Sequence, residues 1–296
     1  GYVLARLAQL DEMQVTVFQH GDSGRLHGDA KTCLDDLKNS GVSIEHSDAM
    51  DLSKFDVIVD AVFGTGLDRP ITGDWKLLIE QINTAYKTVF ALDIPSGLNA
   101  DTGMVMGAVV NATKTMTFIG MKQGLLTGQA ADHCGELVFA DLAVPNSVYE
   151  QLGPANCQRI EYQNQTPSFT HRKASAYKGD FGHVLLIGGD QGYGGAVRMA
   201  AEACARTGAG LVSIATRASH AMTLNIGRPE LMVHAVESYL DLGSLLSKAS
   251  VLTIGPGLGQ SDWAAELFAR VIESNKLQVF DADALNLLAK EPGNQP

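Results

Sequence analysis

Short, continuous runs of apolar and β-branched residues alternate with helix-like segments along most of this chain. The clearest run is residues 56–63, DVIVDAVF, and it is followed by a glycine-rich loop and a helical pattern over residues 74–86. Strands of a parallel sheet that is covered on both faces have such runs, whereas half-exposed strands alternate apolar and polar residues. The sequence therefore predicts the α/β class, with doubly wound parallel sheets in a three-layer arrangement.

The alternation occurs twice, which suits a chain of 296 residues that is long for one domain. Residues 150–180, between the two sets, are rich in Gln, Asn, Thr and Ser and lack apolar periodicity. We therefore expect two domains, at residues 1–152 and 179–296, with a linker at 153–178. The predicted strands are 14–19, 42–46, 56–63, 88–93, 114–119 and 136–140 in the first set and 183–187, 211–215, 231–236, 251–254 and 278–281 in the second; the predicted helices are 2–12, 29–39, 74–86, 196–207, 240–249 and 261–274.

Charge and composition narrow the classes of partner. The formal net charge is -11 at pH 7, which repels phosphate backbones, so we expect no nucleic-acid partner. No apolar run approaches the roughly 20 residues of a membrane-spanning helix, and no signal-peptide pattern occurs, so we expect no membrane partner and a cytoplasmic location. The 4 cysteines form no CxxC pair, which argues against a thiolate metal site and fits a reducing compartment.

Two aspartates lie where apolar strands end. Asp60 ends DVIVD and Asp93 ends TVFALD. Ligands of open parallel sheets bind beyond the carboxyl ends of the strands, so the two carboxylates converge on one cleft if their strands are neighbours. There each could act as a general base, or hold a hydrogen bond or a cation. The alternative is that each only caps the next turn, but two such residues, each before a loop of small residues, favour a function.

The loops after these aspartates have residues that suit a ligand. Residues 64–70, GTGLDRP, follow Asp60; their glycines let backbone N–H groups approach an anion, and Arg69 can pair with phosphate. A lone GxG is also a common turn, so this signal is weak by itself. After Asp93, the segment IPSGLNADTG brings Ser96 near the strand end. Oxygen atoms of Asp60 and Ser96 could share a cation, which spacing alone does not establish.

Two glycine-rich loops follow strands in the second set. GGDQGYGGA, residues 188–196, leads into a helix, and a helix N-terminus with free N–H groups can accept a phosphate. GPGLG, residues 255–259, also lies between a strand and a helix. Together they suggest one cleft of nucleotide size, with close packing of strand on helix as the alternative. Asp281 and Asp283 end the last strand, where we favour capping of the next helix over ligand contact.

Compound motifs in both halves resemble one family. VDAVFGTGLDRPITG and ALDIPSGLNADTG resemble the N-terminal epimerase domain of bifunctional NAD(P)H-hydrate repair enzymes. KGDFGHVLLIGGDQGYGGAVRMAAEACARTGAGLV, TIGPGLG and VFDADALNLL resemble their C-terminal ADP-dependent dehydratase domain, which is similar in fold to ribokinase-type sugar kinases. The resemblance covers almost the whole chain in the family's order. It implies a Rossmann-like first domain and a ribokinase-like second domain.

For function, the resemblance implies repair of a damaged coenzyme. NADH and NADPH hydrated at nicotinamide C6 occur as R and S forms, which the first domain interconverts. The second domain dehydrates the S form with ADP, or ATP, as co-substrate and Mg²⁺ as an optional companion. We expect NAD(P)H hydrate and an adenine nucleotide as partners, and a homo-oligomer. We also hypothesise that Asp93 supplies acid–base catalysis of the epimerisation.

The resemblance also implies roles for single residues. Asp60 and Ser96 would help to bind a potassium ion, and Asp93 would contact the altered ring. The residues implied to bind the hydrate are Gly64, Thr65, Gly66, Leu67, Asp68, Arg69, Pro70 and Asp93 in the first domain and Ala196 and Gly257 in the second.

The sequence departs from the family pattern at both ends. The family's Gly-x-Asn-Asn-Gly-Gly-Asp-Gly loop and its Gly-Met-Gly-Asp motif are absent from this chain. We therefore expect a fragment of a bifunctional protein, without dehydratase activity and with weak or no epimerase activity. Two rival functions remain. A ribokinase-type kinase would need ATP and a phosphorylated product, and a non-catalytic scaffold would have no need for Asp60, Ser96 and Asp93 together.

Overall fold

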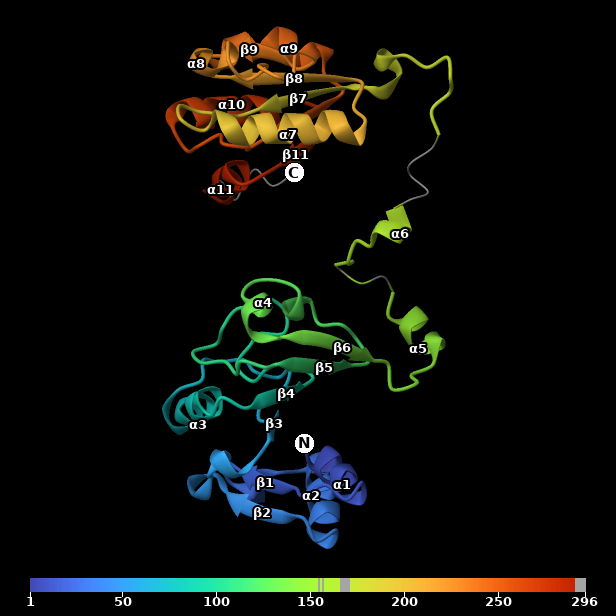
Figure 1. Cartoon of the computed structure of the whole chain (residues 1–296), viewed down its shortest axis with the longest axis vertical. Helices are drawn as coiled ribbons and strands as arrows, with labels where there is room; N and C mark the ends of the chain where they lie inside the picture. The colour runs from blue at the N-terminus through green and yellow to red at the C-terminus, as the bar shows by residue number, and fades with distance from the viewer. Residues whose placement is uncertain (154, 156, 166–170, 291–296) are drawn as a thin grey trace. The chain divides into compact units, whose positions relative to one another are not determined.

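The computed structural model describes residues 1–153, 155, 157–165 and 171–290. The chain divides into two compact units, Gly1–Glu161 and Tyr162–Pro296, and each is described by itself (Figure 1). The boundary falls inside the predicted linker 153–178, part of which lies outside the described residues. Our domain limits at 152 and 179 stay predictions.

The second unit alternates strands and helices, as predicted. Its strands are β7 (His183–Ile187), β8 (Leu211–Thr216), β9 (Met232–Ala235), β10 (Val251–Ile254) and β11 (Leu277–Phe280), and its helices are α6 (Tyr162–Gln165), α7 (Gly194–Thr207), α8 (Ala218–Ala221), α9 (Gly243–Lys248), α10 (Asp262–Ile272) and α11 (Asp283–Lys290). The strands form one parallel sheet in the order β11-β10-β7-β8-β9. The first strand of the unit, β7, lies in the centre of the sheet, with β8 and β9 on one side and β10 and β11 on the other. The chain therefore reverses its direction of winding between β7 and β10. Such a reversal is called a topological switch point.

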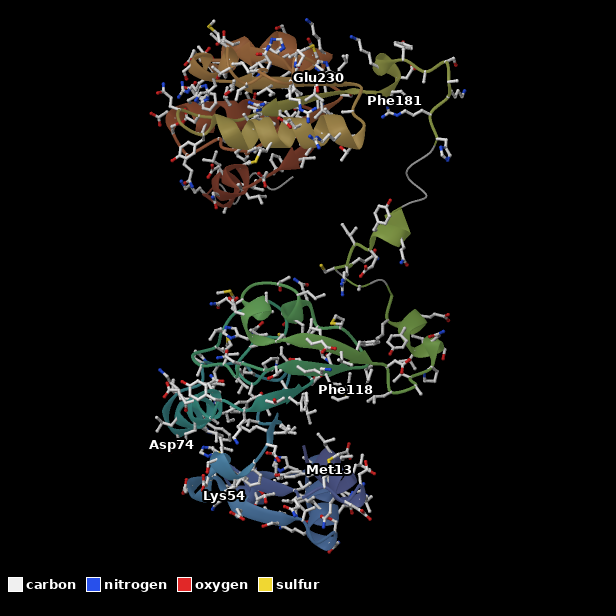
Figure 2. All side chains as sticks on the ribbon, in the orientation of Figure 1. Met13, Lys54, Asp74, Phe118, Phe181 and Glu230 are labelled. Carbon is white, nitrogen blue, oxygen red and sulfur yellow. The ribbon has the colours of Figure 1, made fainter. Side chains whose placement is uncertain are left out.

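Helices cover both faces of this second sheet. Successive side chains of a strand point to opposite faces. Leu185 and Ile187 belong to the core cluster that contains residues of α9, α10 and α11, while Leu186 between them belongs to the cluster that contains residues of α7. The doubly wound, three-layer arrangement is therefore confirmed for this unit, whose packed interior Figure 2 shows with side chains.

The first unit is also α/β, but it contains two sheets. Its strands are β1 (Thr16–Gln19), β2 (Ser43–His46), β3 (Val57–Asp60), β4 (Thr88–Leu92), β5 (Lys114–Phe118) and β6 (Glu136–Ala140), and its helices are α1 (Tyr2–Leu10), α2 (Gly28–Asn39), α3 (Gly73–Thr84), α4 (Ala130–His133) and α5 (Asn146–Gln151). All strand pairs are parallel; β3, β4, β5 and β6 pair in chain order, while β1 and β2 form a separate two-stranded sheet. Sequence patterns predicted these strands but not this division.

Only one face of the four-stranded sheet is well covered at β3. Ile58 of β3 and Val89 of β4 pack with Ile79 of α3 in one core cluster. On the opposite face of β3, Val57 and Val59 are 45% and 42% exposed. Covering of both faces, which the continuous run DVIVDAVF predicted, is thus not found for this strand in the described structure. The run alone cannot show which of its side chains receive a partner.

Strand positions were predicted more accurately than short helices. The limits of β6, β7 and β10 are the predicted ones, whereas α4, α5, α6 and α8 were not predicted because segments of 4–6 residues show no helical period. Within the described residues, none of the helices has the length and apolar character needed to cross a membrane.

Replacing Leu252 with Ala should lower the free energy of unfolding of the second unit by about 2–5 kcal/mol, because it opens a cavity at a fully buried position of β10. Trp263 fluorescence during urea unfolding, in a W75F background, reports on this unit. The matched control is Leu240→Ala, which removes the same atoms from a residue that is 73% exposed. Equal effects of the two changes would contradict the described core.

Candidate functional site

A buried hydrogen-bonded pair joins the ends of β3 and β4. Asp60 is the last residue of β3, and the turn after β4 brings Ser96 against it. The Ser96 hydroxyl donates to Asp60 Oδ1 at 2.6 Å, and the Ser96 backbone N–H donates to Oδ2 at 2.7 Å. Ser96 Oγ also accepts from the N–H of Phe63 at 2.8 Å. Both residues are 1% exposed, so this pair fixes the two strand-end loops relative to each other.

The charge of Asp60 is not balanced by a basic side chain. No ion pair to Asp60 is found among the described residues, and burial raises the pKa of its carboxyl although Ser96 and Val62 donate hydrogen bonds to it. A buried carboxylate without a basic partner needs a proton or a cation. The hard oxygen atoms of Asp60 and Ser96 suit a cation such as potassium, and the described residues contain no cluster of three or more His, Cys, Asp or Glu side chains for a transition metal.

Gly97 makes the turn after Ser96 possible. Its φ is +99°, and a Cβ at this position would lie 1.8 Å from the carbonyl oxygen of Ala108. Only glycine fits such an approach. The N–H of Met106 donates to the Gly97 carbonyl and that of Val110 to the Ser96 carbonyl, at 2.8 and 2.9 Å, so the turn packs against the strand-like segment that follows it.

Asp93 lies one residue beyond β4 in an unusual backbone conformation. Its φ is +72°, which is uncommon for a residue with a side chain, although Asp adopts it more readily than most. Its N–H donates to the Met116 carbonyl of β5 at 2.7 Å. Asp93 Oδ1 accepts from the Thr117 hydroxyl at 3.3 Å and from the Phe118 N–H at 3.2 Å (Phe118 is labelled in Figure 2). The side chain of Asp93 is 29% exposed, so it can meet a ligand.

Asp60 and Asp93 share a sheet edge but have different partners. Their strands β3 and β4 are neighbours in parallel register, with Asp60 beside Ala91. Asp60 bonds to the Ser96 turn, whereas Asp93 bonds to the end of β5 and to the Lys122 ammonium. The condition for a shared cleft, that the two strands are neighbours, is met, and the cleft itself stays a prediction. The two carboxylates nevertheless act as separate groups, one buried and one partly exposed.

The predicted anion loop, residues 64–70, is open to solvent. Leu67 is half-buried and the other six residues are exposed. Within the described structure, the N–H groups of residues 64–69 donate no hydrogen bond. Beyond the loop, the N–H of Ile71 donates to the Met106 carbonyl at 2.8 Å, which holds the loop's end in place. Exposed, unpaired N–H groups in an anchored loop are suited to binding an anion.

In the second unit, the two glycine-rich loops contact each other at the switch point between β7 and β10. The N–H of Gly189 donates to the Pro256 carbonyl at 3.1 Å, and the N–H of Asp190 donates to the Gly257 carbonyl at 2.8 Å. A Cβ on Gly257 would lie 2.5 Å from the Tyr193 carbonyl and 3.2 Å from the Ala196 Cβ. The structure therefore brings Gly257 next to Ala196 in the first turn of α7.

An ion-pair network links the loop at residues 188–196 to the residues that follow β8 and β9. Arg217, just after β8, pairs with Asp190 at 2.7 Å and with Glu237 at 3.0 Å, and its guanidinium lies 4.3 Å from the ring centroid of Trp263. Asp190 also accepts from the Ser261 hydroxyl at 2.7 Å. Partial burial acts to raise the pKa of Asp190, but the hydrogen bonds from Ser261 and Arg217 hold it below its usual value.

Asp283 makes a hydrogen bond that the sequence did not predict. It is the first residue of α11, and its Oδ2 accepts from the N–H of Gly259 at 2.8 Å. The carboxylate therefore ties the 255–259 loop to α11. Neither the helix-cap interpretation nor ligand contact describes this bond.

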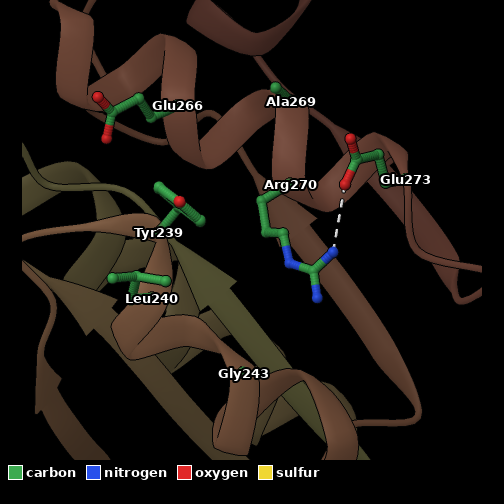
Figure 3. A pocket seen from close by; sticks show the side chains of 7 residues that line it. All are labelled: Tyr239, Leu240, Gly243, Glu266, Ala269, Arg270 and Glu273. Carbon is green, nitrogen blue, oxygen red and sulfur yellow. Dashed lines mark hydrogen bonds and ion pairs between the residues drawn. The ribbon is translucent and has the colours of Figure 1, made fainter.

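A separate surface groove of about 400 Å³ lies beside α10 (Figure 3). Arg270 projects beside it and pairs with Glu273 at 3.2 Å. Tyr239 and Leu240 line its other side. No predicted site residue lines it, so size alone does not identify the site here.

Sequence reasoning missed three charged residues at strand ends: Lys122, Arg217 and Glu237. Each follows a strand, β5, β8 or β9, by a few residues. The rule that pointed to Asp60 would have found Arg217 and Glu237 if it had been applied to every strand and to basic residues as well. Lys122 lies further beyond the end of β5, and no spacing in the sequence indicates its contact with Asp93. Asp190 lies inside the quoted glycine-rich loop but received no role.

Replacing Ser96 with Ala should lower the free energy of unfolding by roughly 1–3 kcal/mol or more, because it leaves the buried Asp60 carboxylate without its hydroxyl donor. Ser53→Ala is the control, since the Ser53 hydroxyl donates to Asp51 at the same 2.6 Å on the exposed surface. Urea unfolding of the first unit measures both. A Ser96→Ala effect no larger than that of Ser53→Ala would contradict the buried pair.

Comparisons with known proteins match the two parts of the chain to two different family models. Residues 1–124 match the family model described as YjeF-related protein N-terminus, and residues 184–295 match that of NAD(P)H-hydrate dehydratase. A crystal structure of a ribokinase-like superfamily protein from Enterococcus faecalis is 36% identical, covers 42% of this chain and 44% of its own, and has a TM-score of 0.39.

Curated relatives match the chain from end to end. The bifunctional NAD(P)H-hydrate repair enzyme Nnr of Coxiella burnetii is 45% identical over 100% of this chain, and that of Escherichia coli is 41% identical over 99%. The chain spans 60% and 56% of the length of these two relatives. With both family models matched in this order, the chain belongs to the family of bifunctional NAD(P)H-hydrate repair enzymes.

Proposed function

We propose that the first unit interconverts the R and S hydrates of NADH and NADPH, and that the second unit takes part in ADP-dependent dehydration of the S form. The observation that supports this most is the edge beyond β3 and β4. There a rigid buried pair, Asp60 and Ser96, lies between an open loop with free N–H groups and a partly exposed carboxylate, Asp93. A dinucleotide with phosphates and one reactive ring needs such a combination.

The phosphates of the hydrate would bind to residues 64–70. The exposed N–H groups of this loop are available donors, and Arg69 is exposed beside them and able to form paired hydrogen bonds to phosphate. The net charge of the chain is negative, so these local donors are needed to attract an anionic substrate.

Asp93 would contact the hydrated ring and move a proton at its C6 hydroxyl. A proton passes from the Asp93 carboxyl to the C6 hydroxyl as the C–O bond breaks, so the oxygen leaves with the electron pair as water and the ring nitrogen stabilises the positive carbon. Water then returns from either face, and the proton that it loses is taken up by a carboxylate. Asp93 Oδ2 accepts no hydrogen bond in the described structure, so this oxygen is available for that transfer. Such general acid–base help is typically worth about 10²–10⁴-fold in rate.

A potassium ion would bind next to Asp60 and Ser96. Potassium would supply the positive charge that the buried Asp60 lacks, and it would keep the strand-end loops in one arrangement. Asp60 and Ser96 oxygen atoms are suitable donors. We assign the catalytic proton transfer to Asp93 and a structural role to the potassium ion.

In the second unit, Ala196 and Gly257 would line the site of the S hydrate. Their closeness at the switch point between β7 and β10 supports this, because ligands of doubly wound sheets bind there. ADP or ATP would be the co-substrate, with Mg²⁺ as companion of the nucleotide. We also propose a homo-oligomer located in the cytoplasm, with no nucleic-acid partner.

Asp93→Asn, made in the full-length product of the gene, should slow the exchange between R and S hydrates by about 10²-fold or more, because the amide cannot take up a proton. Chromatographic separation of the two epimers measures the rate. Asp101→Asn, in the exposed turn of the same segment, is the control. An Asp93→Asn rate within about threefold of wild type, under ~1 kcal/mol of barrier, would remove Asp93 from the chemistry.

Potassium should raise the thermal unfolding midpoint of the first unit above that in tetramethylammonium at equal ionic strength, because it binds only the folded state. Asp60→Asn should abolish the difference, since the uncharged amide needs no cation. Ser96→Ala should reduce it. An identical potassium effect in wild type and Asp60→Asn would show that the ion binds elsewhere.

A further inference from the structure

Lys122 is the basic residue that contacts the proposed catalytic carboxylate. Its ammonium donates to Asp93 Oδ1, to the Thr117 hydroxyl at 3.0 Å and to the Phe118 carbonyl at 2.9 Å. All three N–H bonds of the ammonium therefore have acceptors. The side chain of Lys122 is only 18% exposed, which shields the pair from solvent and screening by salt.

The backbone holds Lys122 in this position. After β5, a tight turn contains Ile119 at φ +64°, and a short 3-10 turn, η4 (Gln123–Leu125), begins directly after Lys122. The Gly124 N–H donates to the Ala100 carbonyl at 2.6 Å, and Leu125 is 2% exposed. These contacts anchor the segment of Lys122 to Ala100, in the segment that follows the Ser96 turn. Both partners of the ion pair therefore belong to one rigid edge.

The donors around Asp93 are unevenly distributed. Lys122, Thr117 and Phe118 all donate to Oδ1, and the described residues offer no donor to Oδ2. The ammonium and the end of β5 therefore set the rotation of the carboxylate. Without the ammonium, only the two longer bonds, at 3.3 and 3.2 Å, would hold it. A left-handed backbone alone does not fix a side-chain rotamer.

We propose that Lys122 is the positioning residue for Asp93: it holds Oδ1 so that Oδ2 faces the reacting ring. The inference rests on the proposed epimerisation. Because its three N–H bonds are already used, Lys122 acts through Asp93 and does not itself move the substrate proton. The competing interpretation is that Lys122 only stabilises the turn after β5. Its loss would then leave the rate of epimer exchange per folded molecule unchanged.

A double-mutant cycle separates these interpretations in the full-length product of the gene. Lys122→Met should lower kcat for epimer exchange by about 10–100-fold and leave KM within about threefold, because a displaced catalytic group costs rate more than binding. Lys122→Arg keeps the cation and should recover most of kcat. In an Asp93→Asn background, Lys122→Met should cost less than about twofold, because residues that act as one unit are not additive.

The control is Lys114→Met on β5, the strand that precedes Lys122; Lys114 pairs with Glu136 at 2.9 Å on the surface, and the kcat of this variant should be unchanged. A kcat of Lys122→Met within about threefold of wild type, or equal losses in both backgrounds, would overturn the positioning role. If Lys122→Met does not fold, a kcat of Lys122→Arg as low as that of Asp93→Asn would overturn it. If wild type gives no exchange above the spontaneous rate, the proposed function fails and this inference fails with it.

Discussion

The first unit depends on one buried interaction, the pair of hydrogen bonds from Ser96 to the Asp60 carboxylate. The bonds are short, 2.6 and 2.7 Å, and both residues are almost fully buried. They join the loops that leave two neighbouring strands, so the open 64–70 loop and the Asp93 region keep a fixed relation. A buried charge is costly unless it is compensated. Here the hydrogen bonds of the buried carboxylate join the two loops into one rigid edge, on which the proposed functional groups are arranged.

In the second unit, the loops that leave neighbouring strands are also held together, but without a buried charge. Its loops after β7 and β10 contact through backbone groups, and glycine at 188 and 257 allows this approach. Arg217 then links Asp190 to Glu237, on loops that follow three different strands. In both units, the proposed site residues lie at the carboxyl edge of a parallel sheet because strand ends from distant parts of the sequence meet there. The large groove beside α10 lies outside this arrangement.

Much of this fold could be predicted from the sequence, because apolar runs and glycine-rich loops are local signals. The strands and the neighbourhood of Asp60 and Asp93 follow from them. Three features could not be predicted. The separation of β1 and β2 from the main sheet depends on long-range pairing. The exposure of Val57 and Val59 depends on which helix covers which face. The role of Lys122 depends on a turn that brings it back to Asp93, and no spacing in the sequence shows this.

The most direct test of the central claim is a crystal structure of the full-length protein with NADPH hydrate and potassium. The account predicts phosphates over residues 64–70, the hydrated C6 carbon within hydrogen-bonding reach of Asp93 Oδ2 through its hydroxyl, and potassium beside Asp60 and Ser96. A hydrate bound to the first unit away from Asp93, or with its ring turned from this carboxylate, would contradict the account.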